Sequence, residues 1–217
     1  MTNYAFIRFI LTFCCLSFLG LSGCSILPQQ SEKIRPAGSL LLLNKWTLKA
    51  KIGIKTPEES GMAHLVWEQD GQDYTIHLRS PVGQQLAKLE RRENQVVLTT
   101  SDGKTTKAQS EDALIFSMFG KPLPISQLRF WVKGLKAPFV PIKPISSSIE
   151  HLEFVQEQWQ VRMEEFQIVD GYRLPMRLKL KYPARKADDA DLDLTIRFIV
   201  KDWQIPVDSD AQASKRK

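Results

Sequence analysis

The chain has 217 residues, of which 43% are hydrophobic, and a formal net charge of +6 at pH 7. This length allows a single domain with a sizeable hydrophobic core. All three cysteines, Cys14, Cys15 and Cys24, lie near the N-terminus, which excludes a disulfide framework in the rest of the chain.

The first residues have the pattern of a secretory signal peptide. One positive charge, Arg8, precedes an apolar run from Ile10 to Leu21, and small residues follow, as is typical of such signals. A transmembrane anchor is disfavoured because the apolar run is shorter than the ~20 residues that span a bilayer. The run ends in Leu-Ser-Gly-Cys, which resembles a bacterial lipobox. Residues 1–23 are therefore expected to be removed and Cys24 to carry lipid.

The segments that flank the predicted domain are polar. Residues 24–38 are expected to be a lipid-anchored tether, and residues 208–217 contain no large apolar side chain and are expected to be disordered. Ser25 stands where enterobacteria-like sorting reads an Asp as inner-membrane retention, so it implies the outer membrane. Loss of Arg8 lowers the net charge from +6 to +5. An exported basic protein meets anionic lipid or cell-wall polymer, so no nucleic-acid partner is expected.

Alternating apolar residues predict a series of strands in the first half of the chain, after a short helix over residues 40–45. Trp46, Leu48, Ala50, Ile52 and Ile54 share one parity, which is typical of a strand with one apolar face. Further strands are predicted over residues 63–67, 74–78, 96–100 and 105–108, with another that starts at Leu86. Their spacing of roughly ten residues predicts an antiparallel meander.

The stretch Arg79–Gln85, RSPVGQQ, predicts a tight turn between two of these strands. Ser80, Pro81 and Gly83 occupy the first, second and fourth positions that a type I turn favours. Val82 is therefore expected at the tip of the turn, where Asn, Asp or Gly is more usual.

Two short amphipathic helices are predicted in the middle of the chain. Ser110 is a typical N-cap and Gly120 a typical stop for the first helix. The second lies between Pro124 and Gly134. Both are expected to lay an apolar face on the concave side of the sheet.

The last third of the chain returns to strand patterns. Residues 137–144 contain three prolines and are predicted to form a loop. Strands are predicted over residues 152–156, 159–168, 174–182 and 192–201, with a hairpin turn at Asp170-Gly171.

No motif for catalysis, phosphate binding or metal binding is present. His64 and His77 are expected on the outward faces of their strands. Glu164 and Glu165 are neighbours in a strand and should face opposite sides, which argues against a glycosidase pair. No catalytic residue, metal site or cofactor is therefore predicted.

The inward-facing residues of the early strands are large and apolar: Trp46, Ile52, Ile54, Leu65, Trp67, Ile76 and Leu78. The pattern is compatible with a filled core and with a cavity that the same side chains line. Periodicity alone does not separate these two alternatives.

Several motifs together resemble the LolB family. They are WTLKAKIGIKT, HLVWEQDGQDYTIHLRSPVGQQ, SEDALIFSMFGKPLPISQLRFWVKG and MRLKLKYP, which span residues 46–203. The resemblance implies a mainly β fold with some α: an incomplete antiparallel β-barrel, or half-barrel, over residues 39–207, whose helices cover a hydrophobic cavity. Phe119, Leu128 and Trp131 of the helices are expected to join the strand residues named above in lining an acyl-chain cavity.

The resemblance also implies a function. A monomeric, non-enzymatic receptor anchored in the outer membrane and facing the periplasm would accept lipoproteins from the soluble carrier LolA. It would hold their acyl chains in the cavity and insert them into the outer membrane, to whose lipids its own anchor binds. Pro81, Val82 and Gly83 would form the loop that touches the bilayer, at a position where the family often has Leu. Lys49, Lys51 and Arg79 are candidates for docking an acidic carrier.

Two alternatives remain open. One is an amphiphile-binding lipoprotein of the same fold that faces the periplasm. The other is a hydrolase of cell-wall or lipid ester bonds, for which the sequence offers no recognisable nucleophile and base.

Overall fold

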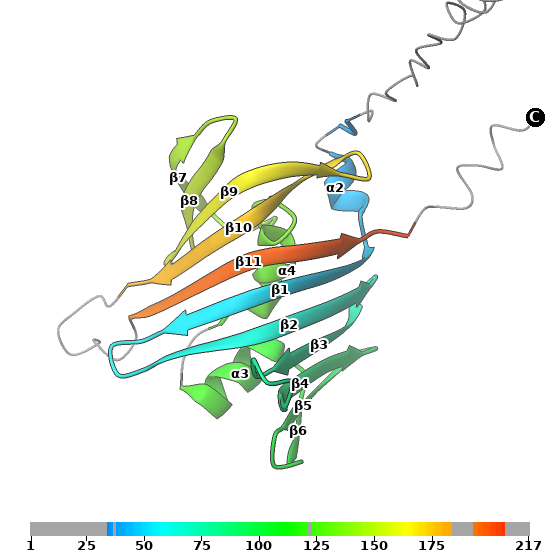
Figure 1. The fold of residues 1–217 in the computed structure, drawn as a ribbon, viewed down its shortest axis with the longest axis vertical. Coiled ribbons are helices and arrows are strands. Elements are labelled where there is room, and N and C mark those ends of the chain that lie inside the picture. Colours follow the sequence, from blue (N-terminus) through cyan, green and yellow to red (C-terminus); the bar gives the residue numbers. More distant parts are fainter. Residues whose placement is uncertain (1–33, 37, 121–122, 184–192, 207–217) are drawn as a thin grey trace, which may run out of the picture. The chain divides into compact units, whose positions relative to one another are not determined.

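The computed structural model describes residues 34–36, 38–120, 123–183 and 193–206, without the side chains of Met118 and Phe119. These residues form eleven strands and three helices (Figure 1). The strands are β1 (Lys45–Lys55), β2 (Ser60–Asp70), β3 (Asp73–Arg79), β4 (Gln85–Arg92), β5 (Gln95–Thr100), β6 (Thr105–Ala108), β7 (Ile142–Ser147), β8 (His151–Gln156), β9 (Trp159–Val169), β10 (Tyr172–Tyr182) and β11 (Leu194–Gln204). The helices are α2 (Ser39–Leu42), α3 (Glu111–Phe119) and α4 (Ile125–Trp131).

All the described strands belong to one antiparallel sheet, in the order β6-β5-β4-β3-β2-β1-β11-β10-β9-β8-β7. Two meanders, β1 to β6 and β7 to β11, meet where β1 pairs with β11, with Ile52 opposite Phe198. Within the described residues β6 and β7 do not pair with each other, so the sheet is curved but unclosed. The predicted mainly β fold, an incomplete antiparallel barrel with helices, is confirmed.

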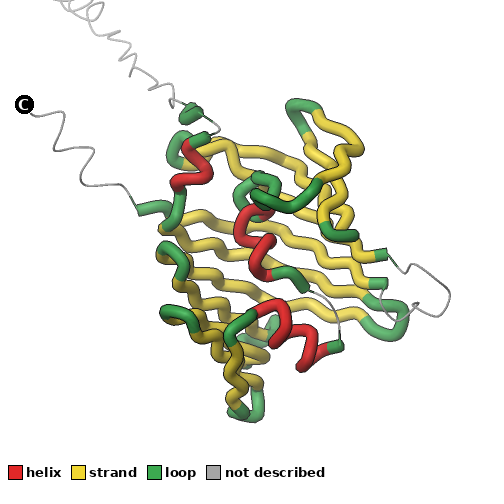
Figure 2. The backbone as a smooth tube through the Cα atoms, turned by 180° about the vertical axis from the view of Figure 1, so that it is seen from behind, coloured by secondary structure: helices red, strands yellow, loops and turns green. Residues whose placement is uncertain are grey.

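The two faces of the sheet differ because side chains alternate along each strand. Along β1 the side chains of Trp46, Leu48, Ala50 and Ile52 are buried, whereas those between them are exposed or half-buried. The helices α3 and α4 cover the buried, concave face, as Figure 2 shows from that side. Figure 1 looks onto the opposite, convex face, which carries no helix among the described elements.

Local signals place the two covering helices where the sequence predicts them. The Ser110 hydroxyl accepts a hydrogen bond from the Ala113 amide at 3.3 Å and caps α3. Gly120 ends this helix with a φ of 64° and donates its amide to Phe116 at 2.8 Å. The α4 region buries the predicted apolar stripe, which consists of Ile125, Leu128, Trp131 and Val132.

The predicted strands are present, but the loop predicted over residues 137–144 is shorter than expected, because strand β7 begins at Ile142. The three prolines favour a loop there, since proline cannot donate to a strand ladder. In the structure Pro144 lies opposite Phe154 on the outermost strand, an edge position where a missing donor is tolerated. The predicted signal peptide (residues 1–23), residues 24–33 and 37 of the tether (24–38), which include Cys24, and the tail (208–217) lie outside the described residues.

Candidate functional site

An apolar cavity of about 330 Å³ lies between the concave face of the sheet and the helices. Its walls come from β1 to β5, from β11 and from the α3–α4 region. The lining residues are Ile52, Ile54, Thr56, Glu59, Leu65, Trp67, Ile76, Leu78, Ala87, Leu89, Leu98, Ile115, Leu123, Ile125, Leu128, Leu194, Ile196 and Phe198. The volume is at the lower end of the ~300–1,000 Å³ that is common for small-molecule sites.

The cavity occupies only part of the concave face because tryptophan fills the rest. Trp131 of α4 reaches toward β8 and β9, where its ring centroid is 6.5 Å from that of Trp159. Its indole Nε1 donates to Gln156 Oε1 at 2.9 Å. The concave face is therefore filled over β8 and β9 and also where Trp46 packs between Trp67 and Trp203, and the cavity lies over the rest of β1 to β5 and over β11.

Seven of the residues predicted for the cavity line it: Ile52, Ile54, Leu65, Trp67, Ile76, Leu78 and Leu128. Trp46 and Trp131 do not, and their assignment to the lining needs correction. Trp46 is packed between Trp67 and Trp203, with ring centroids 5.3 Å from each, and Trp131 fills the space beside Trp159. The side chain of Phe119 lies outside the described residues.

Sequence reasoning missed the contributions of β4, β5 and β11. The alternation of Leu194, Ile196 and Phe198 signals an inward face. It does not signal that β11 pairs with β1 and so closes the cavity wall. Ala87 and Leu89 were missed because the register of β4 was not predicted; a bulge beside Arg79 interrupts its pairing with β3.

The cavity reaches the protein surface at the β1–β2 turn. Ile54 and Glu59 line it there, and the Ile54 side chain is 38% exposed. The turn itself is fixed: the Thr56 amide donates to the Glu59 carbonyl at 2.9 Å, and the Glu59 amide donates to Thr56 Oγ1 at 3.2 Å. We call Ile54 and Glu59 the cavity mouth.

The Val82 turn (Ser80–Gly83) lies at the same end of the sheet as the cavity mouth, since alternate hairpin turns of a meander fall on the same side. The Gly83 amide donates to the Ser80 carbonyl at 2.9 Å, which closes the predicted four-residue turn. Gly83 has a φ of 88°, a value that suits glycine. Val82 is 82% exposed, so its side chain contributes little to the core and is free to contact another surface.

A few polar contacts hold the helices over the cavity. In α3, the Glu111 carboxylate accepts from Arg91 Nη1 of β4 at 2.9 Å. The carboxylate of Asp112 accepts hydrogen bonds from the amide and hydroxyl of Ser126 and so joins α3 to α4. Burial, with Glu111 nearby, raises the pKa of Tyr74 and keeps its phenol neutral.

The end of α4 is held by two buried polar side chains. Gln156 accepts from the Trp131 indole and from the Ala137 amide, and donates to the carbonyls of Ala137 and Val140. Lys133 is 6% exposed and donates to the carbonyls of Leu40 and Leu43 at 3.0 and 2.9 Å. Burial, reinforced by the charge of Arg129, lowers the pKa of Lys133 to about 8.

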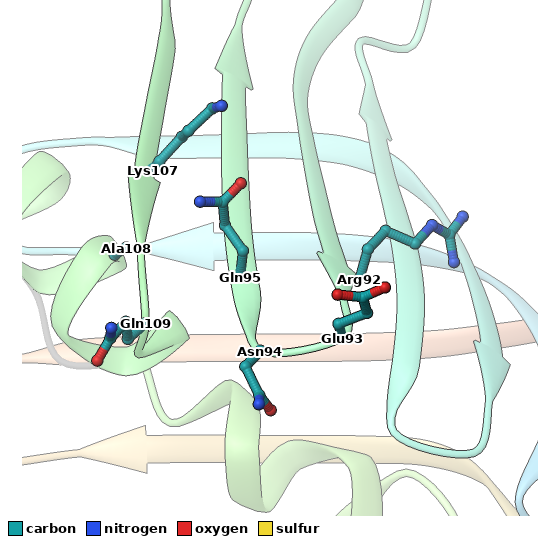
Figure 3. A pocket seen from close by; sticks show the side chains of 7 residues that line it. All are labelled: Arg92, Glu93, Asn94, Gln95, Lys107, Ala108 and Gln109. Atoms are coloured by element: carbon teal, nitrogen blue, oxygen red, sulfur yellow. The ribbon is translucent and has the colours of Figure 1, made fainter.

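A second hollow, of about 420 Å³, lies at the other end of the sheet (Figure 3). Its lining comes from the β4–β5 turn and from β6 and consists mostly of exposed polar side chains: Arg92, Glu93, Asn94, Gln95, Lys107, Ala108 and Gln109. Such a surface does not suit an acyl chain. In the part of the chain that the structure describes, no group of His, Cys, Asp and Glu is arranged to hold a metal ion.

The histidines do not form a recognisable catalytic arrangement. The His151 ring lies between the hydroxyls of Ser146 and Ser148, at 2.9 and 3.0 Å, on the exposed β7–β8 hairpin. No described carboxylate bonds to the ring to orient it, and the hairpin lines none of the hollows described above. His64 is exposed on the convex face.

None of the described helices is long and apolar enough to cross a membrane.

The chain is related to known proteins along most of its length. It is 34% identical over 211 residues to the outer-membrane lipoprotein LolB of Pseudomonas putida (strain F1), covering 92% of this chain and 97% of that one. It is 33% identical over 196 residues to the outer-membrane lipoprotein LolB of Cellvibrio japonicus, covering 89% and 91%.

Comparison of structures supports the fold alone. A DUF1329 family protein from Desulfovibrio piger matches with a TM-score of 0.52 at 8% identity, over 81% of this chain and 91% of that one.

The family model for the outer membrane lipoprotein LolB matches residues 44–203, which is well over half of the chain. With its unclosed sheet and its apolar cavity, the chain therefore belongs to the LolB family of outer-membrane lipoproteins.

Proposed function

We propose that this protein is a receptor that takes lipoproteins from the periplasmic carrier LolA and inserts them into the outer membrane. The observation that supports this most strongly is the apolar cavity, which opens at the end of the sheet that also presents Val82. Membership in the LolB family, a family of non-enzymatic lipoprotein receptors, agrees with it. The protein would act as a monomer.

The energetics require an apolar path. An acyl chain of ~16 carbons gains on the order of 12 kcal/mol when it leaves water, at ~0.8 kcal/mol per methylene. A chain that crossed open water between carrier and membrane would lose this stabilisation on the way. The cavity would remove the need for that crossing by receiving the chain at Ile54 and Glu59 and releasing it nearby.

Cys24 would fix the protein to the membrane into which it delivers. The lipobox predicts a lipid-modified Cys24, and two or more acyl chains make such an anchor stable. Within the expected tether (24–38), Arg35 donates its amide to the Gly171 carbonyl and its Nε to the Asp170 carbonyl. The residues that precede Arg35 would then let the cavity mouth face either the carrier or the bilayer. Mass spectrometry of the mature N-terminus tests this step, and an unmodified Cys24 would refute it.

The receptor function is tested by transfer from the carrier. The chain from residue 32 onward, which contains every described element, is mixed with LolA loaded with a lipoprotein, and the two are separated. We expect the lipoprotein to move to the receptor without added ATP, because no nucleotide motif is present. Cargo that stays on LolA would contradict the proposal.

The role of the Val82 turn is tested by Val82→Glu, with Val82→Leu as the matched apolar control. Cargo uptake and stability should be unchanged in both, since Val82 is exposed. Insertion of cargo into liposomes should slow roughly tenfold with Glu, because burying a Val side chain contributes about 1.5 kcal/mol. Equal insertion by the wild type and the Glu variant would remove this role.

The small cavity favours a second candidate: a lipoprotein of the same fold that binds a single-chain amphiphile. Its 330 Å³ lies in the range of one small ligand. Mass spectrometry of lipids extracted from the purified protein separates the two functions. A stoichiometric single-chain amphiphile, retained in the presence of loaded LolA, would favour the second.

A further inference from the structure

The convex face of the sheet carries a group of cations near the end that contains the cavity mouth. We call Lys51 and Lys55 of β1, Lys179 and Lys181 of β10, and Arg197 of β11 the basic face. All are exposed except Lys181, which is half-buried. They are separate from the cavity, because their side chains alternate with those that face it.

Strand pairing brings these cations into adjacent rows. One row places Met62, Gly53, Arg197 and Lys179 side by side across β2, β1, β11 and β10. The next row, closer to the β1–β2 turn, contains Ser60, Lys55, Thr195 and Lys181. Lys51 lies one row further from the turn, beside Ile199. Across these four strands neither of the first two rows contains an acidic residue; beyond Lys179 the first row continues with Arg162, which pairs with Glu153.

Like charges lie opposite each other on this face, and the nearest described ion pairs, of Arg162 with Glu153 and Glu164, are one strand further on. Arg197 lies directly opposite Lys179, and like charges in that position destabilise a sheet. Cations elsewhere on this face are paired: Arg177 with Glu165, and Lys49 with Asp202. Within the described residues, no member of the basic face forms an ion pair. A partner that supplies negative charge would relieve this repulsion.

The side chains around the cations distinguish between two anionic partners. Met62 is 74% exposed beside this cluster, and Ile199, opposite Lys51, is 37% exposed. Cations with interspersed apolar side chains suit the boundary between lipid headgroups and acyl chains. Protein interfaces are depleted in lysine, whereas four of the five cations here are lysines, which bind phosphate as point charges.

We propose that the basic face binds the headgroups of anionic phospholipids. Headgroup phosphates would neutralise the opposed cations, while Met62 and Ile199 enter the outermost part of the acyl region. Because these rows lie beside the β1–β2 turn, this contact holds the cavity mouth at the bilayer surface. The inference goes beyond the proposed function, since it concerns the face of the sheet opposite the cavity and requires no cargo.

Acetylation of lysines, read by mass spectrometry, tests the proposal on the full-length protein reconstituted into vesicles. One set of vesicles contains phosphatidylcholine alone and the other adds phosphatidylglycerol. On the anionic vesicles we expect acetylation of Lys51, Lys55 and Lys179 to slow at least about threefold. Lys107 of β6 and Lys143 of β7 serve as matched controls, because both are exposed strand lysines without a described ion pair, and they should be unaffected.

Salt and substitution sharpen the test. Protection should disappear at high salt, where the screening length falls from ~8 Å to ~3 Å. Lys179→Gln and Arg197→Gln should each weaken the contact about fivefold, whereas Lys107→Gln should not. Equal acetylation on both kinds of vesicle would overturn the proposal. Protection on neutral vesicles that appears only after an acidic soluble protein, such as the loaded carrier, is added would also overturn it. That result would assign the basic face to protein docking.

Discussion

Replacement of Ala87 by Leu distinguishes an empty cavity from a filled core. Ala87 is on β4, is buried, and lines the cavity. In a filled core the three added carbons would overpack the site and destabilise the protein by about 1–3 kcal/mol. In a cavity of 330 Å³ they have room and become buried without displacing neighbours.

The expected gain follows from the area that the new side chain buries. Three methylene-sized groups contribute ~2.4 kcal/mol at ~0.8 kcal/mol each. Fixing the longer side chain costs about 0.7 kcal/mol of rotamer entropy. Ala87→Leu should therefore stabilise the protein by about 1.7 kcal/mol, which corresponds to a rise of ~0.7 M in the urea midpoint at an m-value of ~2.5 kcal/mol/M.

The same substitution should weaken acyl-chain binding. The new carbons occupy space that three methylenes of a ligand would otherwise fill, so the affinity for a fluorescent fatty acid should fall about fiftyfold. Ala50→Leu is the control, since Ala50 is buried on β1 but does not line the cavity. That variant should lose stability. Destabilisation by Ala87→Leu to the same extent as by Ala50→Leu would show that no usable cavity exists.

Three further predictions concern stability, each measured by urea denaturation. Burial lowers the pKa of Lys133 from its ordinary 10.5 to about 8 in the folded protein. Between these two values the unfolded chain binds more protons than the folded chain, so the free energy of unfolding should rise with pH from about 8 to 10.5. A flat or falling profile that Lys133→Met leaves unchanged would contradict this. Gly83→Ala should cost about 1 kcal/mol because of the φ of 88°, and an unchanged midpoint would mean that the turn relaxes. Gln156→Leu should cost roughly 3 kcal/mol, since it leaves two buried N–H donors without an acceptor; a loss below ~1 kcal/mol would argue against this anchoring role.

Much of the fold is predictable from local patterns. The Ser110 cap and the Gly120 stop bound α3 correctly, because these residues satisfy backbone groups within a single turn. The hairpin turn at Asp170-Gly171 was predicted from its residue types, and both residues have positive φ. Signals of this kind depend only on neighbours in the chain.

The unpredicted features depend on contacts between distant residues. Thr47 pairs with Gln204, at opposite ends of the domain, and no periodicity in either strand identifies the other. The helical periodicity also indicates that Trp131 faces the sheet. It does not indicate whether the side chain lines the cavity or packs in the solid core. The extent of the cavity follows from side-chain volumes in three dimensions, so seven predicted residues line it while Trp46 and Trp131 belong to the solid core.

The unclosed sheet has a mechanical consequence. A closed barrel has a fixed circumference, because any increase in its radius must break a ladder of interstrand hydrogen bonds. Here β6 and β7 are joined through the segment that contains α3 and α4, and not by a described strand pairing. The sheet can therefore flatten, and its interior can enlarge, while every described strand pair stays intact. The resting volume therefore need not limit what the protein holds. Expansion is opposed by the contacts that join β4 to α3 (Arg91–Glu111), α3 to α4 (Asp112–Ser126) and α4 to β8 (Trp131–Gln156), and not by backbone hydrogen bonds between strands.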